Sequence, residues 1–383
     1  MADYLMPAPD SGAAGTEYQT VAALRRLGHE VDTVWADSLS HRVRHGNLHY
    51  LLELPGAYKA TMLARMRRVN YDAIHVNQPH GYLAAKAAAA LRGRTVFIHR
   101  SHGLELRAGR ELRKWQKVFD STDALSWPRL KASRMITWLL CNHSRAIARY
   151  ASGHIVSAGD CATFLTSEMG VPAELVAVIP QAAPMAYTTK PAFEITPSRA
   201  KRVLYVGQYA FIKAPMIVAM AINRITQLDA DVTATWVTAK ASHGQVLELL
   251  SEHARARVTL RDWMPQQELI DVYDSHGIFL FPSFFEGFGK AFLEAMARGL
   301  CVIAADNGGA KDVITNGRDG LLVPTGDVEA MARACIDILA SEGRREAMSR
   351  EAASRARQYT WERVARETVA FYERRLKAER TSA

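Results

Sequence analysis

Long hydrophobic runs are missing from this sequence. A membrane-spanning helix needs about 20 consecutive apolar residues, and a candidate near the middle of the chain, from Met135 to Cys141, is far shorter. The first residues, Met-Ala-Asp-Tyr-Leu-Met-Pro, also lack the basic region and the apolar stretch of a secretory signal peptide. We therefore expect a cytoplasmic protein with no helix across a membrane.

Cysteine and metal-binding patterns are sparse. Four cysteines are scattered along 383 residues in apolar or helical surroundings, which favours buried, reduced thiols over disulfides. The 13 histidines form no ligand cluster: His41, His45 and His49 recur every four residues, but Gly46 and Asn47 interrupt any helix there. We expect no metal site.

Positive charge is what the sequence has in excess. It holds 48 Lys and Arg against 39 Asp and Glu, a net charge of +9. Residues 1–190 carry 23 of the basic and 15 of the acidic residues, and residues 191–383 carry the remaining 25 and 24. This asymmetry predicts an anionic partner for the first half, such as a membrane surface or an acidic glycan. Nucleic acid is not expected, because no recognised reading module accompanies the basic residues.

The chain alternates short β-type runs with helix-type segments, a pattern typical of βαβ units and a parallel sheet. An amphipathic helix is predicted over Glu17–Leu27, ended by Gly28. Strands are predicted in two series. The first comprises Asp3–Met6, Val31–Trp35, Ala73–Val76, Thr95–His99, His154–Ser157 and Val176–Pro180, and the second comprises Arg202–Val206, Val232–Val237, Arg257–Leu260, Ile278–Pro282, Cys301–Ala304 and Leu321–Val323.

A proline-containing stretch separates the two series. Ala183–Lys201 includes Pro184, Pro191 and Pro197, a composition typical of an interdomain linker. After the last predicted strand the pattern is helical to the end of the chain. The sequence therefore predicts an α/β protein, with an N-terminal domain at 1–185, a linker at 186–201, a C-terminal domain at 202–360 and a closing helix at 361–383.

The most informative stretch runs from Phe281 to Gly299. A strand is predicted to end near Ser283, a glycine-punctuated loop carries Glu286, and a helix is predicted to begin around Gly289. The backbone N–H groups of a helix start and the positive end of its dipole favour a phosphate. We therefore expect a phosphate-binding loop here. For an isolated pair of glutamates, a solvated loop and helix surface would be the commoner explanation.

Here the glutamates are not isolated. Glu286 and Glu294 form an E-x7-E pattern within Glu-Gly-Phe-Gly, followed by Ala-Met-Ala-Arg-Gly and by Gly308-Gly309. This combination resembles the donor-binding half of the family-4 retaining glycosyltransferases of the GT-B fold (glycosyl transferases group 1). Further segments resemble the same family: Leu204-Tyr-Val-Gly207 with Lys213, Asn316–Pro324, Ser11-Gly12, Gly28-His-Glu-Val31 and His102-Gly103.

The resemblance covers nearly the whole chain, most closely residues 203–327. It implies two Rossmann-like domains that face each other across a cleft, with the C-terminal helix packing back on the first domain. In this family the first domain binds the acceptor and the second binds the nucleotide-sugar. The family works without a metal. It also has no other cofactor, since the nucleotide-sugar is consumed as a substrate.

The resemblance also implies a role for each matching residue. His102, Lys213 and Glu286 would be catalytic, with His102 near the anomeric carbon and the acceptor. Glu294 would bind the ribose hydroxyls, and Lys213 the diphosphate. The donor-binding set is Gly12, Gly207, Gln208, Lys213, Phe288, Gly289, Lys290 and Glu294, in which Phe288 and Gly289 contribute backbone amides.

The sequence departs from the family pattern in three places. Gln208 stands where an arginine is usual, Gln181 replaces the asparagine of a Pro-Asn-Gly segment, and Lys290 replaces an aliphatic residue. A lysine in the first turn of a helix opposes the dipole. Our hypothesis is that Lys290 supplies the charge that Gln208 lacks; a lysine that simply reaches solvent is about as good an explanation.

The implied activity is retaining, metal-independent hexosyl transfer to a hydroxyl acceptor in polysaccharide or glycoconjugate biosynthesis. UDP is the favoured nucleotide and GDP the alternative; the acceptor could be a glycan, a lipid-linked glycan or a small molecule. Two rivals stay open. A sugar-nucleotide epimerase of the same fold would need no acceptor, and a non-catalytic nucleotide-binding scaffold would show no turnover.

Two other patterns carry weaker signals. Asp229-Ala-Asp231 spells the D-x-D of metal-dependent glycosyltransferases, but it precedes a strand, so a polar turn is the better interpretation. In the segment Leu106–Phe119, Arg107, Arg110, Arg113 and Lys117 recur at helical spacing. A solvated helix face is the commoner explanation, and peripheral contact with the inner face of a membrane or with an anionic acceptor is given nearly equal weight.

Overall fold

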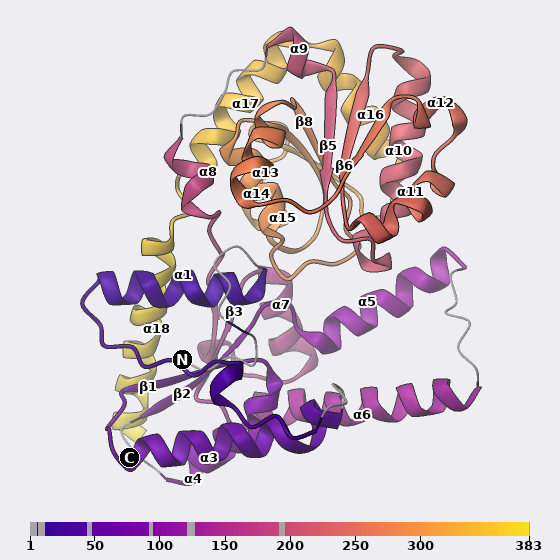
Figure 1. The fold of residues 1–383 in the computed structure, drawn as a ribbon. Helices are drawn as coiled ribbons and strands as arrows, with labels where there is room; N and C mark the ends of the chain where they lie inside the picture. Colours follow the sequence, from indigo (N-terminus) through magenta and orange to yellow (C-terminus); the bar gives the residue numbers. More distant parts are fainter. Residues whose placement is uncertain are drawn as a thin grey trace. The chain divides into compact units, whose positions relative to one another are not determined.

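The computed structural model describes Met6 and residues 12–43, 48–91, 95–120, 127–190 and 196–382 (Figure 1). The chain divides into two compact units. Unit 1 comprises Met1–Gln181 together with Trp361–Ala383, and unit 2 comprises Ala182–Thr360. The strand predicted at Asp3–Met6 lies outside the described residues except for Met6, which belongs to no strand.

Unit 1 is built on a parallel sheet in which four described strands lie side by side in chain order. Parallel neighbours need crossover connections, and helices supply them here. All four strands match predicted ones and are confirmed. They are β1 (Ala73–Asn77), β2 (Val96–Ser101), β3 (Gly153–Val156) and β4 (Val176–Val178).

The strand predicted at Val31–Trp35 is wrong. Within the described residues this segment forms no strand beyond a single bridge position at Val34. Its backbone carbonyls are used differently: Arg25 donates to the carbonyl of Val31, and Arg65 donates to that of Thr33. β-Propensity reflects packing against neighbouring strands, and in this segment only Val34 has the backbone pairing that local sequence cannot supply.

The C-terminal helix α18 (Trp361–Ser382) is part of unit 1 and packs against α1 (Ala13–Arg26). Phe371 of α18 is buried, and a Cβ at Gly153 would lie 2.7 Å from its ring. Glycine at that position therefore lets helix and sheet approach closely. The other described helices of more than one turn in this unit are α3 (Leu54–Met66), α4 (Tyr82–Ala90), α5 (Glu105–Val118), α6 (Trp127–Tyr150) and α7 (Gly159–Thr163).

Unit 2 contains a parallel sheet in the order β10-β9-β8-β5-β6-β7. The first strand of the unit, β5, therefore lies beside its fourth, β8, and the strand order reverses between them. Ligands of open α/β sheets bind at the carboxyl ends of the strands at such a switch point. All six predicted strands are confirmed to within one residue: β5 (Arg202–Val206), β6 (Thr233–Val237), β7 (Val258–Arg261), β8 (Ile278–Phe281), β9 (Cys301–Ala305) and β10 (Leu321–Val323).

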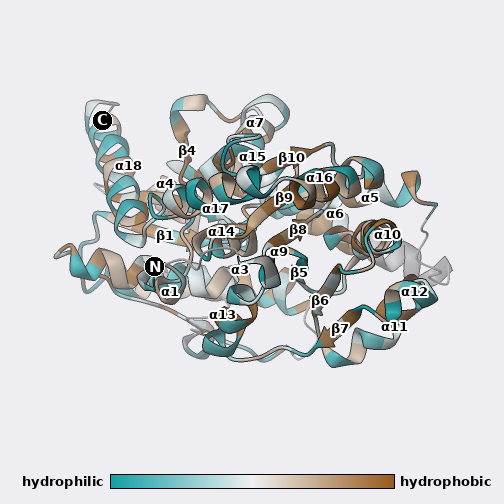
Figure 2. Ribbon diagram, turned by 90° about the horizontal axis from the view of Figure 1, so that it is seen from above, coloured by the Kyte–Doolittle hydropathy of each residue, from teal (hydrophilic) through white to brown (hydrophobic). Residues whose placement is uncertain are grey.

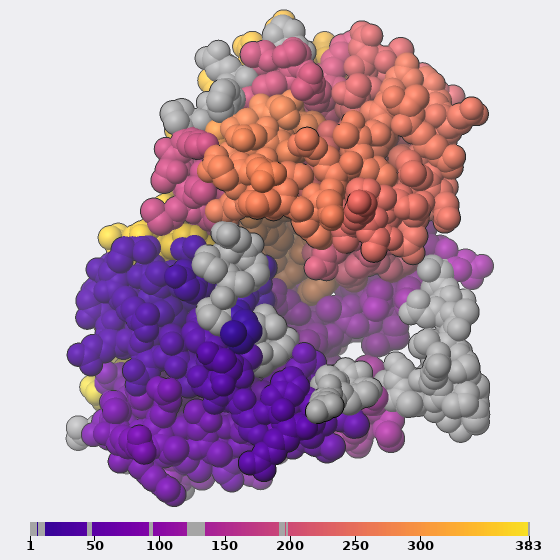
Figure 3. Space-filling view, viewed as in Figure 1, coloured from indigo at the N-terminus to yellow at the C-terminus, as the bar shows by residue number. Residues whose placement is uncertain are grey.

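The core of unit 2 explains why its strands were easy to recognise. Every residue of β8 and β9 is buried, and both strands are coloured as hydrophobic in Figure 2. Helices on both faces of a parallel sheet produce such continuous apolar runs. The main helices are α10 (Pro215–Leu228), α13 (Gln266–Asp274), α14 (Lys290–Ala297), α16 (Val328–Ala340) and α17 (Glu342–Ala356), and the orange segments that include α13 and α14 form a continuous face of the unit (Figure 3).

The segment expected to be a linker is partly packed into unit 2. It contains α8 (Met185–Thr189), in which Tyr187 is buried with its ring 5.5 Å from that of Tyr273. Arg298 donates to the carbonyls of Tyr187 and Lys190. The unit therefore begins before residue 186, because an aromatic anchor outweighs the proline-rich composition around it.

Across the described ranges, no helix is long and apolar enough to span a bilayer. All four cysteines are free thiols, and three of them are buried.

Candidate functional site

Two loops meet at the switch point of unit 2. One follows β5 and ends in the short helix Phe211–Lys213, and the other follows β8 and carries Glu286. Lys213 Nζ lies 2.6 Å from Glu286 Oε1, with side-chain exposures of 29% and 7%. A hydrogen bond between two charged groups is stronger than a neutral one. The pair therefore fixes both loops and leaves part of the ammonium open to solvent or a ligand.

Glycine is required where the second loop enters its helix. Gly289 has φ of +84° and immediately precedes α14, so the predicted helix start is confirmed. A Cβ at Gly289 would lie 2.4 Å from the ring of Phe281 and 3.2 Å from Glu286 Cδ. Any side chain here would overlap the Phe281 ring and press on the buried carboxylate of Glu286.

The loop after β9 packs against the loop that carries Glu286. A Cβ at Gly309 would lie 2.3 Å from the Phe288 ring, so the predicted glycine pair permits close packing. The Phe288 ring is buried against Phe292, which leaves only its backbone to address a ligand. Asn307 donates from Nδ2 to the carbonyl of Ser283 at 2.8 Å. Sequence reasoning missed Asn307, although a polar residue between a buried strand and a glycine pair was a usable signal.

Glu294 lies one turn into α14, at this end of unit 2. Tyr273 donates its hydroxyl to Glu294 Oε2 at 3.3 Å. Burial raises the pKa of Glu294, and the charge of Lys290 and the hydrogen bond from Tyr273 oppose that rise. Lys290 is half-buried one turn before Glu294, so its cation acts on this carboxyl. Whether it also substitutes for a cation at the exposed Gln208 stays a prediction.

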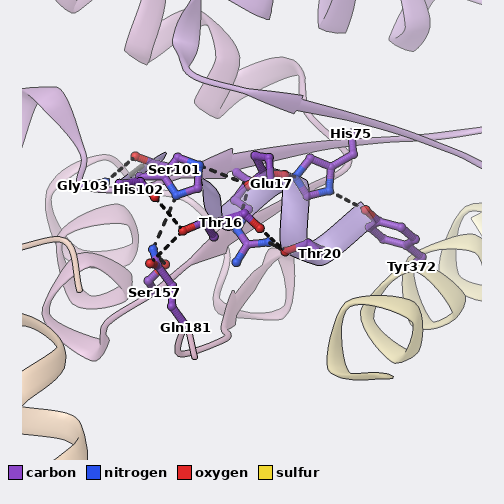
Figure 4. A network of polar contacts seen from close by, with 12 residues as sticks. Thr16, Glu17, Thr20, His75, Ser101, His102, Gly103, Ser157, Gln181 and Tyr372 are labelled. Atoms are coloured by element: carbon purple, nitrogen blue, oxygen red, sulfur yellow. Dashed lines mark hydrogen bonds and ion pairs between the residues drawn. The ribbon is translucent and has the colours of Figure 1, made fainter. Parts of the chain in front are cut away.

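A second polar cluster lies in unit 1, around His102 (Figure 4). Glu17, from α1, is 1% exposed, and its Oε1 lies 3.1 Å from His102 Nε2 and 3.5 Å from Arg100 Nε. Its Oε2 lies 3.8 Å from Nε2 of His75. Burial alone would raise the pKa of Glu17, but Arg100 and then His102 and His75 outweigh burial and hold that pKa well below its ordinary range.

Gln181 approaches His102 from the other side. Its amide Nε2 lies 3.5 Å from His102 Nδ1 and donates to Ser157 Oγ at 3.1 Å. Its carbonyl oxygen accepts a hydrogen bond from Thr16 Oγ1 at 3.0 Å. Gln181, which replaces the asparagine of the family pattern, thus connects the segments that carry Thr16, His102 and Ser157.

The structure groups the predicted residues by unit. Lys213, Glu286 and Gly289 meet at the carboxyl ends of β5 and β8, and Lys290 and Glu294 follow on α14. Gly207 directly follows β5, where a Cβ would lie 2.6 Å from the Tyr205 hydroxyl. His102 and Gly12 belong to unit 1. At Gly12 the backbone has negative φ and nothing described lies within 4 Å of an added Cβ, so no local crowding explains the glycine.

Sequence reasoning missed Glu17 and Arg100. Glu17 shares a helix face with Val21 and Leu24, four and seven residues later, and both are buried. A carboxylate on an apolar face is a usable signal. Arg100 could not be recognised as a site residue because it lies within a strand whose other residues are ordinary for a β-strand.

The D-x-D pair serves a turn in the structure. Lys201 Nζ lies 3.1 Å from Asp229 and 2.9 Å from Asp231, and Asp229 accepts a hydrogen bond from the Asp231 amide. Where side chains are described, no three His, Cys, Asp or Glu residues gather as metal ligands do.

Two compact units, each built on a parallel sheet, define the class of this protein as a two-domain α/β fold. Two family models match it: Glycosyltransferase Family 4 over residues 11–185 and Glycosyl transferases group 1 over residues 200–341. The chain belongs to this glycosyltransferase family, as the sequence motifs predicted.

Curated relatives are named D-inositol 3-phosphate glycosyltransferase. The protein from Corynebacterium aurimucosum is 25% identical over 81% of this chain and 73% of its own length. Those from Corynebacterium urealyticum and Kribbella flavida are 29% and 33% identical over 46% and 44% of this chain. In these two the match spans only 43% and 42% of the relative's length.

Solved structures show the same fold. Sucrose-phosphate synthase from Thermosynechococcus elongatus matches with a TM-score of 0.72 and 20% identity, over 96% of this chain and 94% of that one. HepE from Anabaena, solved with UDP and glucose, matches with a TM-score of 0.66 and 16% identity, over 96% and 97%. The predicted α/β, GT-B-like fold is confirmed.

Proposed function

We propose that the protein transfers a sugar from a nucleoside diphosphate sugar to a hydroxyl acceptor, with retention of configuration and without a metal. The observation that carries this proposal is the Lys213–Glu286 pair beside the glycine-led start of α14, at the switch point of unit 2. Family membership supports the reaction class.

The chemistry of the site suits a diphosphate and a sugar. Lys213 keeps part of its ammonium exposed, and the first amides of α14 add the positive end of a helix dipole. Carboxylates accept hydrogen bonds from hydroxyls. We therefore assign Glu294 to the ribose hydroxyls, Glu286 to the transferred sugar and Lys213 to the diphosphate.

In the proposed step the bond between the anomeric carbon and the diphosphate oxygen breaks, and the acceptor oxygen bonds to that carbon from the same face. The acceptor proton passes to the departing diphosphate. Because negative charge develops on the leaving group, fixed cations and amides lower the barrier. Lys213, the start of α14 and Lys290 supply this charge in our proposal, and His102 borders the reacting atoms.

UDP is our first choice of nucleotide, supported by the UDP complex of the Anabaena neighbour, with GDP as the alternative. The relatives' name suggests a phosphorylated polyol as one acceptor to test. An anionic acceptor also suits the surplus of positive charge in residues 1–190.

We further propose that unit 1 contacts an anionic membrane surface from the cytoplasmic side. Helix α5 buries no residue. Arg107 and Arg110 pair with Asp160 and Glu168, whereas Arg113 and Lys117 are exposed. Exposed apolar side chains accompany them on α5 and α6, a combination typical of interfacial binding: Val118, Met135 and Trp138 are 62%, 60% and 59% exposed.

Calorimetric titration with UDP, GDP, ADP and NAD tests the donor assignment. We expect one nucleoside diphosphate to bind and Glu294→Ala to lose that binding. Glu329→Ala, an exposed glutamate of unit 2, is the control and should bind like the wild type. If no nucleoside diphosphate binds, or only NAD does, the proposal is wrong; a sugar-nucleotide product formed without acceptor would favour an epimerase.

A further inference from the structure

We propose that Glu17 is a positioning residue for His102: its buried carboxylate holds the imidazole with the proton on Nε2 and Nδ1 turned toward Gln181. This inference rests on the function proposed above, in which His102 borders the reacting atoms. It concerns residues 17, 100 and 102 of unit 1, which nothing in the family motifs singles out as a unit.

The carboxylate of Glu17 is closed off from water. It is 1% exposed, and its neighbours Arg100 and His75 are equally buried. A buried charge is tolerated only when it is compensated nearby. Arg100 supplies that compensation at 3.5 Å and also donates to Thr20 Oγ1 on the same helix. Glu17 therefore remains ionised, in agreement with its lowered pKa.

An ionised carboxylate determines the state of the nearest ring nitrogen. His102 Nε2 lies 3.1 Å from Glu17 Oε1, and a lone pair facing that oxygen would be repelled. Nε2 must therefore carry a proton, and Nδ1, which faces the donor nitrogen of Gln181, is the acceptor of the ring. Nδ1 faces the Gln181 amide at 3.5 Å, the outer limit of a hydrogen bond, so it stays available to another partner.

The Gln181 amide is itself oriented. Its oxygen accepts from Thr16, and its nitrogen donates to Ser157, so the nitrogen is the atom directed at His102. Figure 4 shows Glu17 and Gln181 on opposite sides of the imidazole. The two nitrogens of His102 thus have different neighbours, and the ring cannot turn over without losing both.

Exposure separates the roles of the two residues. The His102 side chain is 10% exposed, whereas that of Glu17 is 1% exposed. Only His102 has a side open to a ligand. Glu17 must act through the imidazole and not by touching a substrate.

His75 extends the same arrangement to the C-terminal helix. Its Nε2 faces Glu17 Oε2, and its Nδ1 accepts a hydrogen bond from the hydroxyl of Tyr372 on α18. Glu17 is therefore held between two histidines and an arginine. A carboxylate needed only to neutralise Arg100 would not require either imidazole.

A double-mutant cycle tests the proposal. Turnover is measured as nucleoside diphosphate release from UDP-glucose, UDP-N-acetylglucosamine and GDP-mannose, with inositol 3-phosphate and without acceptor. We expect Glu17→Gln to lower kcat by about 30-fold or more, because displacing a group beside the reacting atoms by about 1 Å can cost up to about 100-fold. In a His102→Ala background the same change should alter kcat by less than about threefold, because residues that act as one unit are not additive.

Glu17→Asp provides the decisive variant if Glu17→Gln does not fold. It keeps the charge beside Arg100 but draws the carboxylate back by about 1.5 Å, one C–C bond. We expect a smaller loss of kcat, again confined to the background that retains His102. Val21→Ala, on the same buried face of α1, is the control for lost packing and should lower the unfolding temperature without changing kcat per folded molecule.

The outcomes are distinguishable. Equal losses of kcat with and without His102, or a loss of UDP affinity in place of kcat, would overturn the positioning role. If the wild type releases no nucleoside diphosphate and binds none, the proposed function fails instead. The contact is then judged by urea unfolding of the wild type, Glu17→Gln, His102→Ala and the double variant. Strongly non-additive losses of stability support the Glu17–His102 pairing, and additive losses overturn it.

Discussion

The ammonium of Lys213 lies 2.6 Å from Oε1 of Glu286, although 73 residues separate them in the chain. The contact exists because β5 and β8 are neighbours in the sheet of unit 2. It ties together the two loops that leave those strands.

Replacing Lys213 with Met should weaken binding of the nucleoside diphosphate by about 100-fold, since a charged hydrogen bond to phosphate is lost. Stability should fall by only about 1–2 kcal/mol, because Lys213 is 29% exposed and solvent screens the pair. Calorimetry and urea unfolding measure the two effects. Lys240→Met, at an exposed lysine of the same unit, is the control and should change neither; unaltered affinity in Lys213→Met would contradict the assignment.

Replacing Gly289 with Ala should destabilise the protein by about 3 kcal/mol. The positive φ costs an alanine about 1–2 kcal/mol, and the added Cβ would overlap the Phe281 ring. Gly343→Ala is the matched control: it lies in α17 with open space around it, and should stabilise by up to about 1 kcal/mol. Chemical denaturation compares the two, and a Gly289→Ala midpoint near that of the wild type would show that the loop can rearrange freely.

Some parts of the fold and of the site could be predicted from the sequence, and others could not. The strands of unit 2 were predictable because β8 and β9 are apolar at every position, and the start of α14 because Gly289 ends a patterned loop. The Glu17 cluster was not predictable, because its members come from α1, β1, β2 and α18 and meet only in the folded unit. Val31–Trp35 misled for a related reason: its β-type composition is local, whereas the pairing that makes a strand depends on the rest of the fold, and only Val34 is paired.

Lys290→Ala should weaken nucleotide binding far more than Gln208→Ala if Lys290 supplies the charge missing at position 208. Its cation already acts on Glu294, so its removal should also raise the pKa of that carboxyl further. Titration calorimetry of both variants at two pH values measures affinity and proton uptake together. Small and equal losses would leave Lys290 as a lysine that only balances the charge of Glu294.

Acidification should destabilise unit 1 through its buried histidines. Burial lowers the pKa of His75 to about 3 and that of His154 to about 4. Both stay neutral in the folded state while the unfolded chain takes up protons below its ordinary value of about 6.5. Stability is therefore unaffected by these groups above that pH and falls below it, by up to about 1.4 kcal/mol per pH unit for each, until the folded pKa is reached.

Urea unfolding of the wild type and of His154→Gln between pH 7.5 and 4.5 measures this effect. The variant removes one titrating ring but keeps a hydrogen-bonding side chain. We expect a lower midpoint at neutral pH and a flatter decline toward acid. Parallel curves for the two proteins would show that His154 takes up its proton without unfolding.

Sedimentation with vesicles tests the membrane contact. Arg113 and Lys117 are two of the exposed cations of α5, and each basic residue near an anionic surface contributes about 1 kcal/mol. The protein should sediment with phosphatidylserine-containing vesicles, not with phosphatidylcholine alone, and release as salt screens the charges. Changing both residues to Glu should lower partitioning by more than about tenfold, because attraction becomes repulsion.

The control for the α5 double variant must carry the same change in net charge at a position outside α5. Arg67→Glu with Arg68→Glu supplies it, since both arginines are exposed in unit 1 at the end of α3. If the two double variants lose vesicle binding equally, the attraction is a property of total charge and α5 has no special part in it. If only the α5 variant loses binding, Arg113 and Lys117 mark the face that meets the membrane, together with the exposed Val118, Met135 and Trp138.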